Sequence, residues 1–276
     1  MQEDSAAASM DLIAGNYTEE LQTRDVAVWI DPIDGSKALA EGNLDHVTNM
    51  IGITVAGRPR VGIIHKPFCS ENKNRSRTYV GSTESGLFFF DHGKNDRTSS
   101  APTYVPPFAN IGDVTVTNGA HFQPHMCFGT NAEQETMMQR VFQDIMPVKV
   151  NRVKGPGNKF LHLTNENSDF FMNLVPGYSM WDICASEAIF ASRFGILTDA
   201  RQKPLFYDAN RRSFGLYNGI VAARDAGVYL NAQNTYEDKS GSTLAQSQMQ
   251  IRRDLHLKNQ ERQRLLSSNV PHQQMQ

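Results

Sequence analysis

The sequence predicts a layered α/β or α+β protein, because short apolar runs typical of strands alternate with helical patterns in two blocks. The clearest helix signal covers 181–194. There, Ile183, Phe190 and Phe194 share one face, as in a helix that is buried along one side. Gly195 is placed to end that helix.

Apolar runs that stop at Pro or Gly turns give the expected strands of both blocks. The first block has strands at 26–30, 47–55, 60–65 and 86–90, and the second at 114–117, 148–153, 169–174 and 219–223. Helical spacing is expected at 131–145 and 159–163, and a Ser/Thr/Pro-rich loop at 95–110 joins the blocks. We therefore expect a partial N-terminal α+β lobe (1–110), a C-terminal α/β lobe (111–230) and a polar tail, helical or disordered (231–276).

Composition excludes several classes of protein. With 27 Lys and Arg against 29 Asp and Glu, the 276-residue chain carries a net charge of −2 and has no basic footprint for a nucleic-acid polymer. Cys69, Cys127 and Cys184 have no disulfide-framework or zinc spacing, which suits a reducing, cytoplasmic location. The sequence has neither a long apolar stretch nor a signal-peptide pattern, so no membrane partner is expected.

The strongest functional signal is the stretch 29–36, Trp-Ile-Asp-Pro-Ile-Asp-Gly-Ser. Asp31 and Asp34 stand three residues apart at the end of an apolar strand, and Pro32 bends the chain so that both carboxylates can face one point. The carbonyl of Ile33 lies between them. Carboxylate and carbonyl oxygens are the ligands that Mg²⁺ prefers, so the pattern predicts a magnesium site.

The next two residues predict a phosphate site beside the metal. Gly35 permits close backbone approach, and the N–H groups of Gly35 and Ser36 open a helix-like segment. Metal ligands next to phosphate donors are what metal-assisted phosphoester hydrolysis needs. The alternative is an Asx-type turn, which is common for Asp-Pro and Asp-Gly in loops.

These residues resemble the inositol monophosphatase superfamily, whose pattern is a strand followed by Asp-Pro-(Ile/Leu)-Asp-Gly-(Thr/Ser). A second motif of that family, Trp-Asp at a helix start with small residues after it, has its counterpart at 181–187. The resemblance implies a layered αβαβα sugar-phosphatase-like fold with two lobes and the site between them. It also implies that Mg²⁺ is held by Asp31, the Ile33 carbonyl, Asp34 and Asp182. The alternative for Asp182 is simple compensation of its helix dipole.

Within the superfamily, the chain resembles the 3′(2′),5′-bisphosphate nucleotidases over roughly 26–223. The supporting stretches are 35–42, 45–48, 62–68 and 155–159. The resemblance implies that Gly155 and Lys159 meet the adenosine phosphate; the alternative is a glycine turn with a surface lysine. Thr117 and His121 lie where those nucleotidases have a Thr and a His beside the nucleotide, with a spacing one residue longer here. Asp182 is expected to contact the substrate as well as the metal.

The implied reaction is Mg²⁺-dependent removal of the 3′-phosphate from adenosine 3′,5′-bisphosphate, giving AMP and phosphate, and acting also on its sulfated precursor in sulfur metabolism. Ser36 and Asp34 are the expected catalytic residues, with Ser36 orienting the attacking water. Family members are generally inhibited by lithium. Two alternatives stay open: an inositol polyphosphate 1-phosphatase, and a non-catalytic binding protein.

The second alternative arises because the family places more of its first lobe ahead of this strand. That part holds a helix with a catalytic Asp and a Gly-Glu-Glu segment whose first Glu binds metal. On this alignment Gln2 stands at the metal Glu and Glu3 at the second Glu. We therefore expect an N-terminally truncated chain with an incomplete first lobe, no partner acid for Ser36, and one exposed face on the first sheet.

Overall fold

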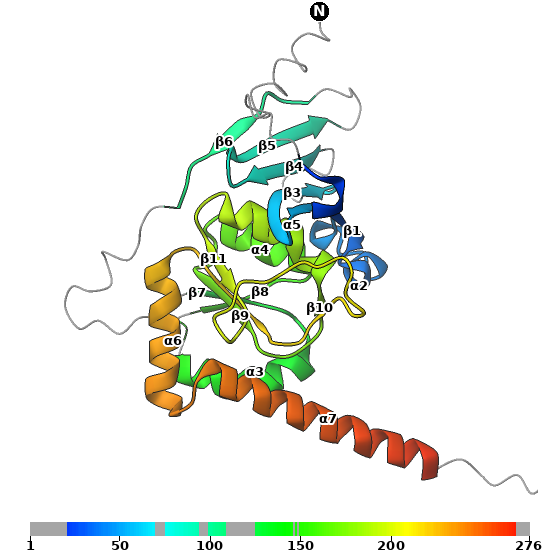
Figure 1. Ribbon diagram of the computed structural model, residues 1–276, viewed down its shortest axis with the longest axis vertical. Coiled ribbons are helices and arrows are strands. Elements are labelled where there is room, and N and C mark those ends of the chain that lie inside the picture. Colours follow the sequence, from blue (N-terminus) through cyan, green and yellow to red (C-terminus); the bar gives the residue numbers. More distant parts are fainter. Residues whose placement is uncertain are drawn as a thin grey trace, which may run out of the picture.

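The computed structural model describes residues 21–69, 75–93, 99–108, 125–145, 147 and 149–268, with side chains described as far as 264. The described part forms four layers, namely a sheet, a pair of helices, a second sheet, and a further group of helices (Figure 1). Both sheets pack against the middle helices, so the layered α/β expectation is confirmed.

The first sheet is a six-stranded antiparallel meander in which each strand pairs with the next in sequence. Its strands are β1 (Val26–Asp34), β2 (Thr48–Val55), β3 (Arg58–Lys66), β4 (Arg75–Ser82), β5 (Gly86–Gly93) and β6 (Thr103–Val105). Three short helical segments accompany β1: η1 (Thr23–Asp25), α2 (Ser36–Ala40) and η2 (Leu44–His46). The pairing of β1 with β2 shifts register between Asp31 and Asp34, so the metal-motif residues sit on an irregular strand end.

Two features of this sheet differ from the sequence expectations. Strand β4 was not expected because its residues are mostly polar and its apolar positions are few. Strand β6 lies inside the stretch 95–110 that was expected to be a loop, which corrects that expectation. The edge of β5 supplies the backbone partners for β6, and such pairing leaves no compositional signal.

The second sheet has five strands in the order β11-β13-β9-β7-β8, with β7 parallel to both β8 and β9. These strands are β7 (His125–Phe128), β8 (Lys149–Arg152), β9 (Phe170–Asn173), β11 (Ile196–Thr198) and β13 (Ile220–Ala223). A separate two-stranded pair joins β10 (Tyr178–Ser179) to β12 (Gly215–Leu216). The expected strand at 114–117 lies outside the described residues.

Helices α4 (Pro156–Thr164) and α5 (Met180–Ala191) fill the layer between the sheets. The helix expected at 181–194 is thus confirmed, but its expected end is wrong. The helix stops at Ala191, and Phe194 rather than Gly195 takes the left-handed conformation (φ 66°), with its ring 72% exposed. Gly195 is required for packing instead, because an added Cβ would lie 2.5 Å from the ring of Phe190.

Helix α5 lies unusually close to the first sheet because glycine faces it on three adjacent strands. The register places Gly52, Gly62 and Gly81 in one row across β2, β3 and β4. An added Cβ would lie 2.5 Å from Cys184 Sγ at Gly52 and 2.8 Å from Ser192 Oγ at Gly81, and at Gly62 it would overlap the Ala185 carbonyl. We call these three residues the glycine row.

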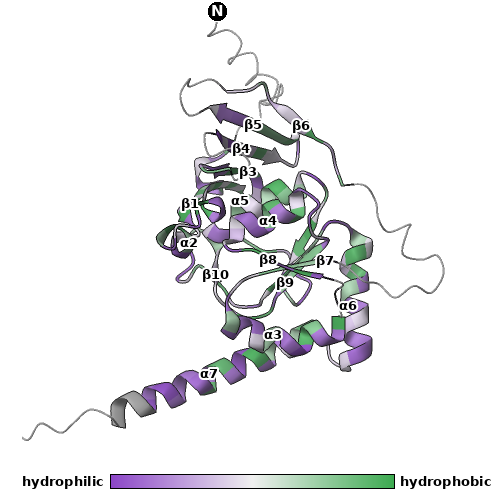
Figure 2. Cartoon of the chain, turned by 180° about the vertical axis from the view of Figure 1, so that it is seen from behind, coloured by the Kyte–Doolittle hydropathy of each residue, from purple (hydrophilic) through white to green (hydrophobic). Residues whose placement is uncertain are grey.

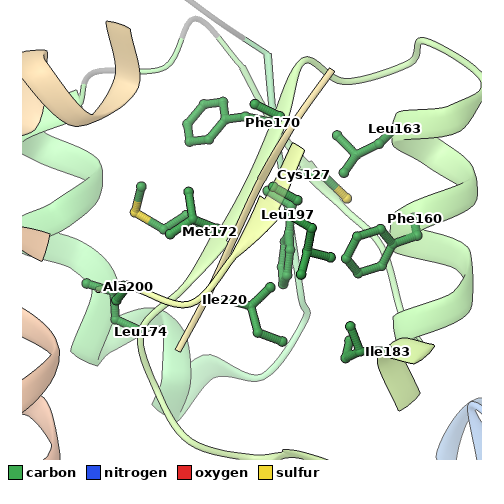
Figure 3. Close-up of a cluster of buried hydrophobic side chains, with 14 of the residues drawn as sticks. Cys127, Phe160, Leu163, Phe170, Met172, Leu174, Ile183, Leu197, Ala200 and Ile220 are labelled. Atoms are coloured by element: carbon green, nitrogen blue, oxygen red, sulfur yellow. The ribbon is translucent and has the colours of Figure 1, made fainter. Parts of the chain in front are cut away.

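The main hydrophobic core lies around the second sheet. In Figure 3, Phe160 and Leu163 of α4 lie on one side of the strands, and Phe170 and Met172 of β9 point to the other side. Helices α3 (Ala132–Ile145) and α6 (Ala226–Ser240) cover that other side. Burial on both faces explains why β9 is apolar along its length rather than alternating.

The region expected to be a polar tail is largely ordered helix. Helix α6 spans the expected boundary at 230, and Tyr236 is buried within it. Helix α7 (Leu244–Ser268) follows, packs Ile251 and Leu255 against the core, and then runs away from the body with mostly hydrophilic residues (Figure 2). Within the described residues, no helix is long and apolar enough to cross a membrane.

Within the described residues, apolar side chains at the β1–β2 edge of the first sheet are exposed on its outer face. Val28 and Ile30 are each 56% exposed, and Ile51, the register partner of Ile30, is 36% exposed. The inner face of the same strands is buried under α4 and α5.

This difference between the two faces predicts a matched pair of truncations. Ile64→Ala removes a fully buried side chain from the inner face and is expected to cost about 2–5 kcal/mol. Ile30→Ala, on the outer face, is expected to cost less than about 1 kcal/mol. Urea unfolding of the two variants measures both values, and equal losses would contradict the assignment of the faces.

Candidate active site

Two carboxyl groups from distant parts of the chain, one buried and one half-buried, meet between the lobes. Asp31 stands near the end of β1 and Asp182 stands in the first turn of α5, and each lies close enough to the other to shift its pKa. The convergence of Asp31 and Asp182 expected from the two sequence motifs is therefore present.

The start of helix α5 fixes the position of Asp182. Ser179 is the N-cap, and Asp182 completes a capping box in which its Oδ2 accepts a hydrogen bond from the Ser179 N–H at 2.7 Å. Asp182 thus compensates the helix N-terminus, as the alternative reading held, and faces Asp31 at the same time. The two roles coexist because a carboxylate offers several acceptor sites.

The environment disfavours charge on both members of this pair. The pKa of Asp182 is raised to about 7, mainly by burial and also by the charges of Asp31 and Asp34, against the Ser179 hydrogen bond. Burial also raises the pKa of Asp31, although its interactions with Asp182 and with the Ile33 N–H oppose the shift. Asp182 therefore resists ionisation near neutral pH, and a cation bound beside it would oppose that shift.

Asp34 lies close to the pair but points toward helix α4. Its Oδ2 accepts hydrogen bonds from Thr48 Oγ1 and from the Gly157 N–H, both at 2.8 Å. Burial raises the pKa of Asp34 to about 6 despite these bonds and the charge of Lys159. Asp34 therefore joins the strand end of the first sheet to the N-terminus of α4.

The turn after Asp34 is shaped by Gly35. Its φ of 79° lies in the left-handed region, and an added Cβ would lie 2.5 Å from the His46 carbonyl oxygen. Ser36 is the first residue of α2, and the Ile33 N–H donates to Asp31 Oδ1 at 3.2 Å. The Asx turn of the alternative reading is thus present at Asp31, and its backbone holds the carboxylate in place.

Lys159 is a buried ammonium and not a surface lysine, which corrects the alternative reading of the 155–159 stretch. Its side chain is 6% exposed, and Nζ donates to Tyr178 Oη at 3.0 Å. The surrounding Tyr178, Cys127 and Asp34 raise its pKa in spite of burial, which acts the other way as the largest single cause. An ammonium held charged in such a place suits an anionic ligand.

Three of the expected phosphate and nucleotide residues line one cavity of about 460 Å³, whereas Ser36 and Asp182 are not among its lining residues. Gly35, Gly155 and Lys159 all face it. Sequence reasoning missed several residues of this wall, namely Lys37, Glu41, Gly129, Asn131, Gln134 and Lys154. Lys37 could have been predicted from the sequence, because it directly follows Ser36 of the 29–36 motif. The position of the other residues in the wall depends on how α3, β7 and α4 pack together.

The described residues offer the oxygen donors that a divalent cation prefers, but they do not form a complete coordination site. Within the described part of the chain, no three His, Cys, Asp or Glu side chains are arranged so that they can hold a metal ion together. Asp31 and Asp182 supply carboxylate oxygens, which are ligands that Mg²⁺ prefers. Asp34 instead accepts a hydrogen bond from the Gly157 N–H. The ligand set expected from the sequence stays a prediction. Thr117 and His121 lie outside the described residues.

Comparison with known proteins places these features in a family. The pattern of the inositol monophosphatase family matches residues 2–237 of the chain. The rat 3′(2′),5′-bisphosphate nucleotidase 1 is 28% identical over 215 residues, which cover 76% of this chain and 62% of the rat protein. Putative inositol monophosphatase 3 of Drosophila melanogaster is 24% identical over 225 residues, covering 82% of this chain and 56% of that protein. The chain thus spans roughly three fifths of the length of these relatives.

Solved structures confirm the expected fold. SaIMPase-II with bound inositol monophosphate aligns with a TM-score of 0.59 at 16% identity, covering 86% of this chain and 80% of that chain. An inositol monophosphatase from Zymomonas mobilis aligns with a TM-score of 0.56 at 18% identity, covering 85% and 81%. SaIMPase-II with bound 2′AMP aligns with a TM-score of 0.58 at 15% identity, covering 83% and 74%.

The raised pKa of Asp182 predicts a pH-dependent cost in stability. An acid whose folded pKa lies above its unfolded value binds more protons when folded, so its contribution to stability falls as pH rises from about 4 through 7. Asp182→Asn removes this charge and keeps an oxygen that can cap Ser179. In metal-free buffer, the variant's melting temperature relative to the wild type should therefore increase between pH 5 and pH 8.

His46, His65 and His162, whose pKa values burial lowers, titrate in both the variant and the wild type. Their contribution therefore cancels in the difference between the two melting temperatures. A difference in melting temperature that stays constant across this pH range would show that Asp182 is an ordinary ionised carboxylate.

Proposed function

Because the chain belongs to the inositol monophosphatase family, we propose that it acts as a Mg²⁺-dependent phosphatase that removes the 3′-phosphate from adenosine 3′,5′-bisphosphate to give AMP and phosphate. The observation that carries the proposal is the pair of Asp31 and Asp182, linked through Asp34 to the N-terminus of α4. Gly155 and Lys159 of the same segment face the 460 Å³ cavity that Gly35 also lines.

Asp31, Asp182 and the Ile33 carbonyl are the groups proposed to hold the cation, with Asp34 as a further ligand when it turns from Gly157. A bound divalent cation supplies polarisation of the phosphoryl oxygens and a lower pKa for the attacking water. Because Asp182 would have to be ionised to hold a cation and its pKa is raised, metal affinity should increase with pH.

The backbone after Asp34 is proposed to hold the phosphate that is cleaved. The N–H groups of Gly35 and Ser36 open α2 without carbonyl partners from a preceding turn, and they would keep the phosphoryl group in line for attack. The Ser36 hydroxyl would orient the water. The family resemblance gives Ser36 an acidic partner on a helix, and no residue of this chain is assigned to that role.

The cationic groups of the cavity favour a substrate with a second negative group. Lys159, Lys37 and Lys154 all line it, and Glu41 is the acidic residue among its lining residues. Lys154 is paired with Glu41, which leaves Lys159 and Lys37 to face a second phosphate. A nucleoside 3′,5′-bisphosphate carries such a second group, and the nucleotidase relatives support this choice.

An inositol phosphate is the second candidate substrate, because relatives named inositol monophosphatase 3 and structures of inositol monophosphatases also match the chain. Comparison of phosphate release from adenosine 3′,5′-bisphosphate and from inositol polyphosphates, with and without Mg²⁺, separates the two. Binding of either ligand without any turnover would favour the non-catalytic alternative.

Magnesium is expected to stabilise the protein. Ligand that binds only the folded state stabilises it by RT ln(1 + [L]/Kd), or about 2.7 kcal/mol at a hundredfold excess over Kd. Thermal melts with and without millimolar Mg²⁺, at matched ionic strength, measure this shift. Asp31→Asn is expected to lose it, and a wild-type melt indifferent to Mg²⁺ would contradict the metal site.

Asp34→Asn is expected to lower turnover of adenosine 3′,5′-bisphosphate by about 10²-fold or more, because it removes a carboxylate from the reacting centre while keeping the side-chain shape. The hydrogen bonds from Thr48 and Gly157 can still be accepted by the amide oxygen, so circular dichroism should report an unchanged fold. Wild-type turnover in this variant would remove Asp34 from the catalytic set.

Lys159→Ala should raise the KM for the bisphosphate nucleotide more than it lowers kcat, because Lys159 is proposed to touch the substrate away from the bond that breaks. Lys203→Ala, an exposed lysine outside the cavity, is the matched control. If Lys159→Ala lowers kcat alone and leaves KM unchanged, its assignment to nucleotide binding is wrong.

A further inference from the structure

A second cavity, of about 500 Å³, lies where the β3–β4 end of the first sheet meets η2 and helix α4. We propose that this cavity binds a small molecule that bears a phosphate or sulfate group, at a site separate from the carboxylate centre. Its size is within the range of pockets that hold small ligands. It shares no lining residue with the 460 Å³ cavity of Gly35, Gly155 and Lys159, and none of Asp31, Asp34 and Asp182 lines it.

The cavity has an excess of positive charge. Lys66, Arg75, Arg77 and Arg152 line it, against Asp45 and Asp91. Arg77 is matched by Asp91 through two hydrogen bonds, from Nε at 2.6 Å and from Nη2 at 2.9 Å. Arg152 is paired with Glu135 on helix α3. Among the described residues, no ion pair is present at Lys66 or Arg75, although Asp45 lies near Lys66 and Asp91 near Arg75.

Lys66 is the central group of this cavity. Its side chain is partly buried, and burial is the main cause that lowers its pKa. Among the described residues it makes no hydrogen bond or ion pair, although Asp45 and Cys69 interact with its charge. An ammonium removed from water without a close partner gains free energy from an anion placed beside it.

Two histidines in the cavity wall, His46 and His162, have pKa values that are affected by its positive charge. Burial lowers the pKa of both His46 and His162, and the charge of Lys66 lowers both further. The rings are therefore neutral at pH 7, and each can donate one N–H to an anion without adding charge. Asn167 and the Arg75 guanidinium complete a set of donors suited to a tetrahedral anion.

The cavity touches the proposed active site through one shared contact. The Asn158 side chain donates to the His46 carbonyl at 2.6 Å, and both residues line the cavity. The same carbonyl lies against Gly35. The carboxylate centre needs a cation to take up phosphate, but the 460 Å³ cavity also carries Lys159 and Lys37. Variants at Lys66 and at Lys159, compared in metal-free buffer, therefore distinguish the two sites.

The first test is isothermal titration of inorganic phosphate, and separately of sulfate, into the chain in metal-free buffer with chelator. Saturable binding is expected, and Lys66→Gln should weaken it about tenfold, the loss expected for one charge-assisted hydrogen bond. Lys203→Gln and Lys159→Gln should leave it unchanged. The absence of binding to the wild type, or a loss caused by Lys159→Gln rather than Lys66→Gln, would overturn the proposal.

A second test needs no variant and so does not depend on whether Lys66→Gln folds. Cys69 lines the cavity and is partly exposed, whereas Cys127 and Cys184 are buried. Anionic iodoacetate should alkylate Cys69 faster, relative to neutral iodoacetamide, than it alkylates a free cysteine, because the cavity attracts anions. Phosphate should slow both reactions. A ratio at or below that of free cysteine, or no protection by phosphate, would contradict an anion site here.

Discussion

The arrangement of the molecule depends on how closely helix α5 can approach the first sheet. Side chains on the facing strands would hold the helix farther from the sheet, but the glycine row removes them where α5 crosses β2, β3 and β4. Ala185 of the helix then packs directly on Gly62. Because the first turn of α5 is fixed in this way, Asp182 reaches Asp31 at the end of β1, and the candidate site exists only through this contact.

The same contact makes the site costly to the metal-free protein. Three carboxyl groups are drawn out of water, and burial raises the pKa of each of them. Each acid accepts a backbone hydrogen bond, from Ile33 for Asp31, from Ser179 for Asp182 and from Gly157 for Asp34. The last two bonds also cap the N-termini of helices α5 and α4. Asp34 and Asp182 thus help to fix the N-termini of α4 and α5 relative to the first sheet, which is a structural role in addition to their proposed chemistry.

Much of the site was predictable from the sequence, because its signals are local. Asp31, Gly35 and Asp182 stand in short motifs whose residue types follow from the chemistry they serve. The glycine row was not predictable, since its members align only through strand register. The burial of Lys159 depends on Tyr178 and on Gly129, which follows β7, and these residues are distant from Lys159 in the sequence. The end of α5 was misplaced because Gly195 serves packing there, and Phe194 takes the left-handed turn.

One double-mutant cycle tests the central claim most directly. Unfolding free energies of Asp31→Asn, Asp182→Asn and the double variant give the coupling between the two carboxyl groups, expected at about 0.5–3 kcal/mol for groups in contact. In a Gly62→Ala background, where a Cβ would meet Ala185, this coupling should fall toward zero. In Gly42→Ala, where nothing lies within 4 Å and the cost is confined to the turn, it should persist. Undiminished coupling in the Gly62→Ala background would contradict the account.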